Sequence, residues 1–198
     1  MMTPAAIARL SAIKKLAPHF HLSLQSGSDA VLAAMRRPYR ITQVREALAA
    51  LRRSIPGVTF TTDVIVGFPG ETEETFSETV AFCREARFLR LHVFPYSPRP
   101  GTPAATFPDQ IPGEIKRGRV RELVKAGREI AKDLLSDLID RKTPLSVVFE
   151  TRDGEYLTGH SENYIEVRVK TDLDLTGQIR RVLPTALSGD GVIGTIAE

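Results

Sequence analysis

The chain of 198 residues contains a single cysteine, Cys83. One cysteine excludes an internal disulfide framework and any cysteine-ligated metal cluster built from this chain alone. No apolar run approaches the roughly 20 residues needed to span a bilayer. The first residues also lack the order of basic, apolar and small residues that marks a signal peptide. We therefore expect a cytoplasmic protein that makes no membrane contact.

The sequence also has no recognisable phosphate-binding loop. The turn Gly67–Glu71 matches neither GxGxxG nor GxxxxGK[ST]. The helix after it would start with Glu73 and Glu74, so that three carboxylates would repel a pyrophosphate placed there. Metal-ligand spacing is equally absent from the histidines, which we interpret as structural or exposed: His19, His21, His92 and His160.

The overall composition is that of an ordinary globular protein. Apolar residues make up 42% and charged residues 26% of the chain, and the net charge is +3. This charge leans only mildly towards a polyanionic partner. The length allows one large domain or two small ones.

The stretch Thr59–Val66 is the centre of the pattern. Its β-branched and apolar residues predict a buried strand, followed by a turn at Gly67–Glu71 and a helix that Thr72 opens. A largely apolar strand of this kind is typical of a parallel sheet covered by helices. Because ligands of such sheets bind at the carboxyl ends of strands, this turn is a candidate site. The alternative is a turn whose glycines merely permit positive φ.

The rest of the first 140 residues alternates between helix and strand patterns. We expect a semi-rigid loop at Pro95–Pro103, where four prolines exclude a regular ladder, and Cys83 on the buried face of its helix. We expect Ser28 or Asp29 to cap the second helix and Thr42 to cap the third. Basic residues, Arg119 among them, occupy the outer side of the last helix, and such a run usually means a solvated face. The expected helices are Met1–Ala17, Ala30–Arg36, Thr42–Ile55, a helix from Thr72 and Pro112–Asp140, and the expected strands besides Thr59–Val66 are His19–Leu24 and Leu89–Phe94.

After Pro144 the periodicity changes to two. Five short strands with polar turns predict a small β-barrel or sandwich. We therefore place a domain boundary at residues 141/142, with domains 1–141 and 142–198. Three strand–helix units are too few for a closed (β/α)8 barrel and look like part of one, with exposed edges. The five predicted strands are Leu145–Thr151, Tyr156–Gly159, Tyr164–Lys170, Gln178–Leu183 and Val192–Ala197.

Four motifs, in order, resemble a known family. They are His21–Asp29, Met35–Tyr39, Asp63–Thr72, and His92–Ser97 with Gly101–Ala104. Together they resemble the radical S-adenosylmethionine methylthiotransferases that modify tRNA, with the branch acting on N6-threonylcarbamoyladenosine 37 as the nearest in pattern. The terminal β-domain resembles their RNA-binding TRAM domain. The resemblance implies the later half of a radical-SAM (β/α) barrel followed by a TRAM/OB-like domain.

The resemblance also implies a cofactor set. The family cleaves S-adenosylmethionine at a 4Fe-4S cluster held by a CxxxCxxC loop and takes the methylthio group through a second cluster. This chain lacks that loop, so we expect a carboxy-terminal fragment whose cluster ligands lie upstream of Met1. We expect such a chain to be inactive alone, and we assign it no catalytic residue and no metal ligand.

What remains is half of a cofactor site, as the resemblance implies. Polar residues after the first strand would face the aminocarboxylate of S-adenosylmethionine, and Arg37 would pair with its carboxylate. The alignment favours Arg37, with Arg36 as the alternative. The implied cofactor-binding residues are Gln25, Ser26, Ser28, Arg37, Asp63, Gly67, Phe94 and Pro95.

Each of these residues has a structural alternative. Gln25, Ser26 and Ser28 would otherwise satisfy turn amides and cap a helix, and Asp63 would be a buried, hydrogen-bonded acid without a ligand.

The TRAM resemblance implies tRNA as the partner. Phosphate contacts would come from Arg152, Arg168, Lys170, Arg180 and Arg181, with Tyr156 and Tyr164 as stacking surfaces. The competing hypothesis is a non-catalytic RNA-binding module in which the incomplete barrel is a spacer. In either case the open barrel edge would associate with a missing amino-terminal half or with a second copy.

Overall fold

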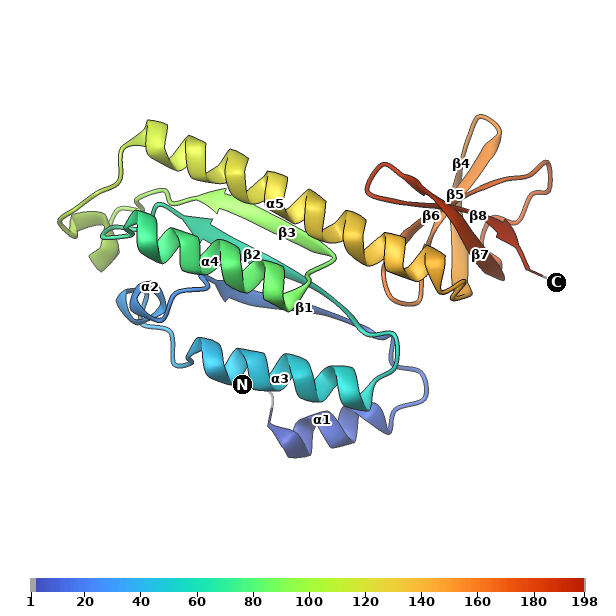
Figure 1. The fold of residues 1–198 in the computed structure, drawn as a ribbon, viewed down its shortest axis with the longest axis horizontal. Coiled ribbons are helices and arrows are strands. Elements are labelled where there is room, and N and C mark those ends of the chain that lie inside the picture. The colour runs from blue at the N-terminus through green and yellow to red at the C-terminus, as the bar shows by residue number, and fades with distance from the viewer. Residues whose placement is uncertain (1–2, 198) are drawn as a thin grey trace.

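The structure, a computed structural model, describes residues 3–197. Figure 1 shows a layered α/β part joined by one long helix to a small all-β part. The elements in chain order are α1 (Pro4–Ser11), β1 (His19–Gln25), α2 (Asp29–Ala34), α3 (Ile41–Ser54), β2 (Thr59–Val66), α4 (Glu73–Ala86), β3 (Arg90–Pro95), the 3-10 helix η1 (Pro103–Thr106), α5 (Gly113–Asp140), β4 (Leu145–Asp153), β5 (Tyr156–Ser161), β6 (Glu166–Lys170), β7 (Ile179–Ser188) and β8 (Gly191–Ile196).

The predicted parallel sheet is confirmed. Strands β1, β2 and β3 form a three-stranded parallel sheet with β2 in the centre. One face of β2 buries Phe60, Val64 and Val66 against the helices, as alternation along a strand requires. The other face carries polar residues, including Thr61 and Asp63. The sheet therefore has one apolar and one polar face.

Helices cover the apolar face. Leu51 of α3, Phe76 and Cys83 of α4, and Leu123 of α5 are fully buried in one cluster. The prediction that Cys83 faces the core is confirmed. Burial raises the pKa of its thiol to about 12, so the thiol stays protonated and unreactive at neutral pH.

Several predicted helix starts or ends differ from those observed; α2, for example, ends at Ala34 rather than Arg36, which has a φ of 55°. The first helix ends at Ser11 rather than Ala17, because the chain turns through residues 12–18 to reach β1 and leaves Ile13 exposed; Met1 and Met2 lie outside the described residues. Helix α3 begins at Ile41, so Thr42 is not its cap. The free Ile41 amide donates to Asp29 Oδ1 at 2.8 Å. Asp29 thus caps α3 across a turn, while Ser28, at the N-cap of α2, makes no side-chain capping bond.

The all-β part is a closed five-stranded barrel in the order β4-β5-β6-β8-β7. All five predicted strands are present, and closure decides between the sandwich and the barrel. Strand β6 begins at Glu166 rather than Tyr164, because Tyr164 has a φ of 67° and belongs to a turn. Gly159 lies so close to the Val148 carbonyl that any Cβ there would overlap it.

Helix α5 connects the two parts. Its first half packs on β3 and α4, and its last turns place Leu135 in the barrel core, where Leu89 of the α/β part also lies. Helix α5 ends at Asp140 and strand β4 begins at Leu145, so the predicted boundary lies in the segment between them. The division into domains at 141/142 stays a prediction. None of the helices in residues 3–197 is long and apolar enough to cross a membrane.

The barrel also touches the polar face of the sheet. Thr59 Oγ1 donates to the Asn163 carbonyl at 2.5 Å, and the ring of Tyr164 stacks on His19 with centroids 4.7 Å apart. Burial, with a contribution from His21, lowers the pKa of His19, so its ring is neutral at neutral pH. The barrel thereby covers the end of the sheet where the strands begin. The end where they finish is left uncovered by it.

Candidate functional site

Three of the predicted cofactor residues lie at the carboxyl edge of the sheet. Gln25 is paired with Val64, and Val66 with Pro95, so Gln25, Gly67 and Pro95 end three neighbouring strands. Gln25 has a φ of 71° beside an irregularity in the β1–β2 ladder. A strained residue at a strand end is a common feature of ligand sites.

The turn after β1 contains one satisfied and one unsatisfied serine. Ser26 Oγ lies 3.2 Å from Thr79 Oγ1 and accepts the Ser28 amide at 3.1 Å, so its hydroxyl has a structural role. Ser28 is 1% exposed, and its hydroxyl has no hydrogen-bond partner among the described residues. A buried hydroxyl without a partner costs free energy unless a ligand or water meets it.

Arg37 lines a cavity of about 270 Å³ at this edge. Arg36, which has a φ of 55°, lies beside it, so the choice between the two arginines stays open. The opposite wall is formed by Ile65 and the rings of Phe68 and Tyr96. The Tyr96 hydroxyl is buried and has no partner within the described part of the chain. Two cations and apolar rings around one cavity suit a ligand with an anionic group and a flat apolar group.

Asp63 does not line this cavity. Its Oδ2 lies 3.2 Å from His21 Nε2 on the polar face, and the rings of His21 and His92 are 5.8 Å apart. Phe94, half exposed, shares this face and pairs in register with Ile65. The polar face is therefore a second, more open surface, next to the cavity and continuous with it through Ile65.

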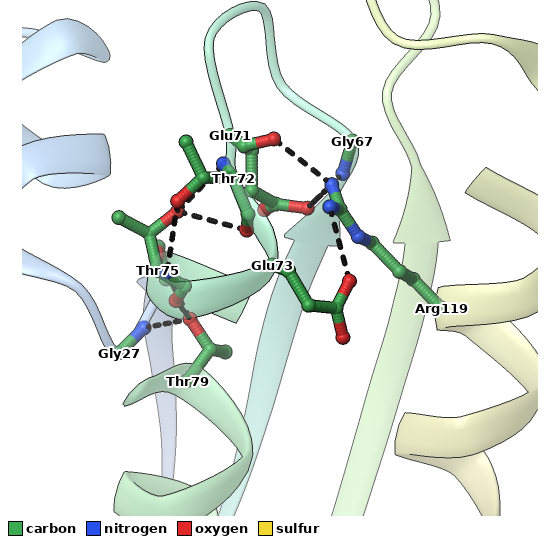
Figure 2. Close-up of polar contacts among 9 residues, drawn as sticks. Gly27, Gly67, Glu71, Thr72, Glu73, Thr75, Thr79 and Arg119 are labelled. Atoms are coloured by element: carbon green, nitrogen blue, oxygen red, sulfur yellow. Dashed lines mark hydrogen bonds and ion pairs between the residues drawn. The ribbon is translucent and has the colours of Figure 1, made fainter. Parts of the chain in front are cut away.

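The loop at Gly67 is held by a buried ion pair that the sequence analysis missed. Glu71 Oε1 accepts the Gly67 amide at 2.7 Å and Arg119 Nη1 at 2.7 Å. Arg119 also donates to the Glu71 carbonyl and lies 3.5 Å from Glu73. Figure 2 shows the guanidinium of α5 reaching across to this loop. The Gly67 amide is thus occupied within the chain.

The expectation that Arg119 lies on the outer side of its helix is wrong. Its side chain is 8% exposed, and that of Glu71 is 1% exposed. Burial raises the pKa of the Glu71 carboxyl, while the Gly67 amide and Arg119 oppose this shift. The signal was present in the sequence, since Arg119 falls on the same helical stripe as the buried Leu123, Ala126 and Ile130.

The basic residues predicted to bind RNA lie on the barrel surface, where Arg168 is half-buried and the others are exposed, and most contact other residues of the chain. Arg152 donates to the carbonyls of Thr171 and Leu173, and Arg180 to Gln178. Arg168 pairs with Asp153 and Lys170 with Glu155.

The two tyrosine rings proposed as stacking surfaces also contact other side chains of the protein. The Arg168 guanidinium lies over the Tyr156 ring, and Tyr164 stacks between His19 and His160. An RNA base would have to replace these neighbours or use the remaining ring faces.

The ligands that an iron–sulfur cluster would need are not brought together among the described residues. The described residues contain no group of three or more His, Cys, Asp or Glu side chains able to hold a metal ion. Cys83, the single cysteine of the sequence, is buried away from the carboxyl edge in the core between the helices and the sheet. The residues described here do not fit an iron–sulfur cluster.

Comparisons with known proteins point to one family. Residues 1–83 match the family model of the Radical SAM superfamily. The threonylcarbamoyladenosine tRNA methylthiotransferase MtaB of Bacillus subtilis is 40% identical over 91% of this chain and 41% of its own length. The tRNA-2-methylthio-N(6)-dimethylallyladenosine synthase of Tropheryma whipplei is 45% identical over 71% of the chain and 30% of its own length. The chain thus spans about two fifths or less of these relatives.

A solved structure agrees on the fold. The radical SAM enzyme coproporphyrinogen III oxidase (HemN) of Escherichia coli has a TM-score of 0.54 at 15% identity, over 92% of this chain and 44% of that one. At this identity the match speaks for the fold alone. Over most of its length the chain is thus similar to tRNA methylthiotransferases, and its first 83 residues match the Radical SAM superfamily.

Proposed function

We propose that this chain is the carboxy-terminal part of a tRNA methylthiotransferase that adds a methylthio group to C2 of a modified adenosine at position 37. The observation that carries the proposal is the cavity at the carboxyl edge of the parallel sheet, which is lined by two arginines and by Tyr96, whose buried hydroxyl has no partner among the described residues. In this account the three-stranded sheet is the later half of a radical-SAM barrel, and its polar face is turned towards the barrel interior.

The residues at this edge fit S-adenosylmethionine, which supplies the radical chemistry of the family when a cluster is present. Arg37 or Arg36 would hold its carboxylate by charge-assisted hydrogen bonds. Gln25 and Ser28 do not line this cavity, and in this proposal they orient the polar end from the adjoining turn after β1. Ile65 and Tyr96 would pack on the adenosine, with Asp63 on the adjoining polar face. Gly67, Phe94 and Pro95 would shape the edge.

The iron–sulfur clusters would be held by another part of the enzyme. The chain has one cysteine, and that residue is buried in the core. Reconstitution of the purified chain with iron and sulfide should therefore give no 4Fe-4S absorption. A chain that assembled such a cluster alone would contradict this division of roles.

We further propose that the closed barrel is a TRAM-like domain that binds tRNA, and that the substrate is N6-threonylcarbamoyladenosine. The match to the Bacillus subtilis enzyme supports both points, since it extends over 91% of the chain and so includes barrel residues. A non-catalytic RNA-binding module is the second candidate, favoured by the absence of further cysteines.

A chimera tests the proposal and separates the two candidates. The part of the Bacillus subtilis enzyme that this chain does not match is joined to the chain and expressed in cells without a methylthiotransferase. We expect 2-methylthio-adenosine in tRNA digests by mass spectrometry, and a strong loss on Arg37→Ala or Arg36→Ala, which identifies the arginine used. A chimera that carries both clusters, binds tRNA and yet leaves it unmodified would favour the non-catalytic module.

A further inference from the structure

The outer face of α5 carries five exposed cations in a single stripe. Their spacing of four, four, three and four residues keeps them on one side of the helix over roughly 22 Å, at 1.5 Å per residue. They are Arg117, Arg121, Lys125, Arg128 and Lys132, which we call the α5 stripe.

Two of the six acids of α5 form ion pairs with arginines in or just after α4. Glu129 pairs with Arg84 at 2.7 Å and Asp137 with Arg87 at 2.6 Å, both on the side of α5 that faces α4. No residue of the α5 stripe forms an ion pair with any carboxylate in residues 3–197. The other acids of α5 are Glu114, Glu122, Asp133 and Asp140, and Asp190 of the β7–β8 turn lies beside Arg128. Glu129 also lies one turn from Lys125, whose charge contributes to lowering its pKa.

Like charges one helical turn apart repel each other, and nothing in the fold requires them here. This arrangement differs from the barrel, where Arg168 and Lys170 each have a carboxylate of their own. A row of cations without ion-pair partners attracts a linear polyanion, and the gain is largest for a phosphate backbone, which releases counterions when bound.

The position of the α5 stripe in the fold also favours a linear polyanion as its partner. Figure 1 shows α5 running from beside the carboxyl edge of the sheet to the barrel. Near its start, Lys116 Nζ donates to the Tyr96 carbonyl at the end of β3, and near its end Leu135 enters the barrel core. A backbone lying along the stripe would therefore join the candidate cofactor edge to the barrel.

We propose that the α5 stripe binds the phosphate backbone of RNA and guides it between the barrel and the carboxyl edge of the sheet. The proposal deepens the proposed function, because it takes tRNA as the partner. An anionic membrane is a poorer fit, since the residues between the cations of the stripe include no exposed large apolar side chain.

The test compares two triple variants with the same change in charge. Arg121→Gln, Lys125→Gln and Arg128→Gln neutralise the middle of the stripe, whereas Arg9→Gln, Lys14→Gln and Lys15→Gln neutralise exposed cations near α1, on the opposite side of the α/β part in Figure 1. Binding of the full chain to a tRNA transcript is measured by fluorescence anisotropy over a range of salt concentrations. Thermal unfolding checks that both variants fold.

The slope of log affinity against log salt is negative, and the stripe triple should make it shallower, by about 0.7–0.9 for each lost phosphate contact. Its affinity at low salt should fall by about tenfold or more, with the α1 triple unchanged. Equal effects from the two triples, or none, would overturn the inference while leaving tRNA binding by the chain intact. An unmodified chain that binds phosphatidylserine vesicles but no tRNA would overturn both the inference and the proposed partner.

Discussion

The sheet and the barrel differ in how completely each satisfies its own backbone and polar groups. Every strand of the barrel has two neighbours, because the barrel is closed. In the sheet, β1 pairs with β2 alone among the described residues, and an apolar cavity of about 330 Å³ lies between β1 and α3. Arg168 and Lys170 of the barrel each pair with a carboxylate, whereas the hydroxyls of Ser28 and Tyr96 have no partner among the described residues. The sheet therefore has the features of a part that other groups complete.

The largest expected effect is on the sheet side, at the buried ion pair. Arg119→Met leaves Glu71 buried without its cation, which should cost about 3–5 kcal/mol of unfolding free energy. The free Glu71 carboxyl would have a still higher pKa, so the folded state would bind its proton more tightly than the unfolded chain. The loss should accordingly be greatest at neutral pH and shrink under mild acid.

Urea unfolding at the two pH values measures this, with the exposed Arg117→Met on the same helix as the control. A loss as small as that of the control would show that the pair does not hold the loop. Reaction of Cys83 with a thiol reagent reports unfolding of the α/β part alone, because the barrel has no cysteine.

Gly159→Val should give the next largest effect, confined to the barrel. The new side chain would overlap the Val148 carbonyl, and overpacking of this kind costs about 1–3 kcal/mol or more. Amide exchange in β4 and β5 should accelerate while Cys83 stays unlabelled. The neighbouring Thr158→Val should leave both unchanged. Simultaneous exposure of Cys83 would mean that the two parts unfold as one, against the predicted division at 141/142.

A smaller effect is expected where the two parts meet. Thr59→Val removes the hydroxyl that donates to the Asn163 carbonyl, at a cost of about 1 kcal/mol. The exposed Thr195→Val in β8 is the control. In the NMR spectrum, the amides of Asn163 and Tyr164 should shift. Unchanged signals there would show that the barrel does not rest on the sheet in solution.

The smallest effect concerns an exposed pair. The hydrogen bond from Arg87 lowers the pKa of Asp137 below its ordinary value of 3.8. The contribution of this ion pair to the free energy of unfolding is present above that value and is lost as the pH falls through the lowered pKa. This pH dependence is opposite in sign to that of the buried Glu71. Asp137→Asn should therefore reduce the loss of stability in acid. An acid unfolding curve identical to that of the unmodified chain would contradict this.

The sequence predicted regular elements better than it predicted long-range polar contacts. Helix α5 and the five barrel strands have long or repeated periodic patterns, so their positions were close to those observed. The first helix was extended too far, because Ile13 continues the apolar spacing without reaching the core. Asp29 caps α3 rather than α2, a contact across twelve residues that local rules for capping do not reveal.

The candidate site shows the same limit. Strand ends are readable from the sequence, and this placed Gln25, Gly67 and Pro95 at one edge. The pairing of Glu71 with Arg119 joins residues 48 positions apart, and only the fold brings them together. The residues that line the cavity beside Arg37 come from four separate segments. The motifs contained Tyr96 and Phe68, but the implied cofactor-binding residues did not include them.

The most direct test of the central claim is an NMR titration of the ¹⁵N-labelled chain with S-adenosylmethionine. The account predicts shifts confined to the carboxyl edge, at Gln25, Ser28, Arg37 and Gly67, that are weakened in Arg37→Ala or Arg36→Ala. The barrel amides should stay in place. Shifts centred on the barrel, or no shifts at any concentration, would contradict the claim that this edge is half of a cofactor site.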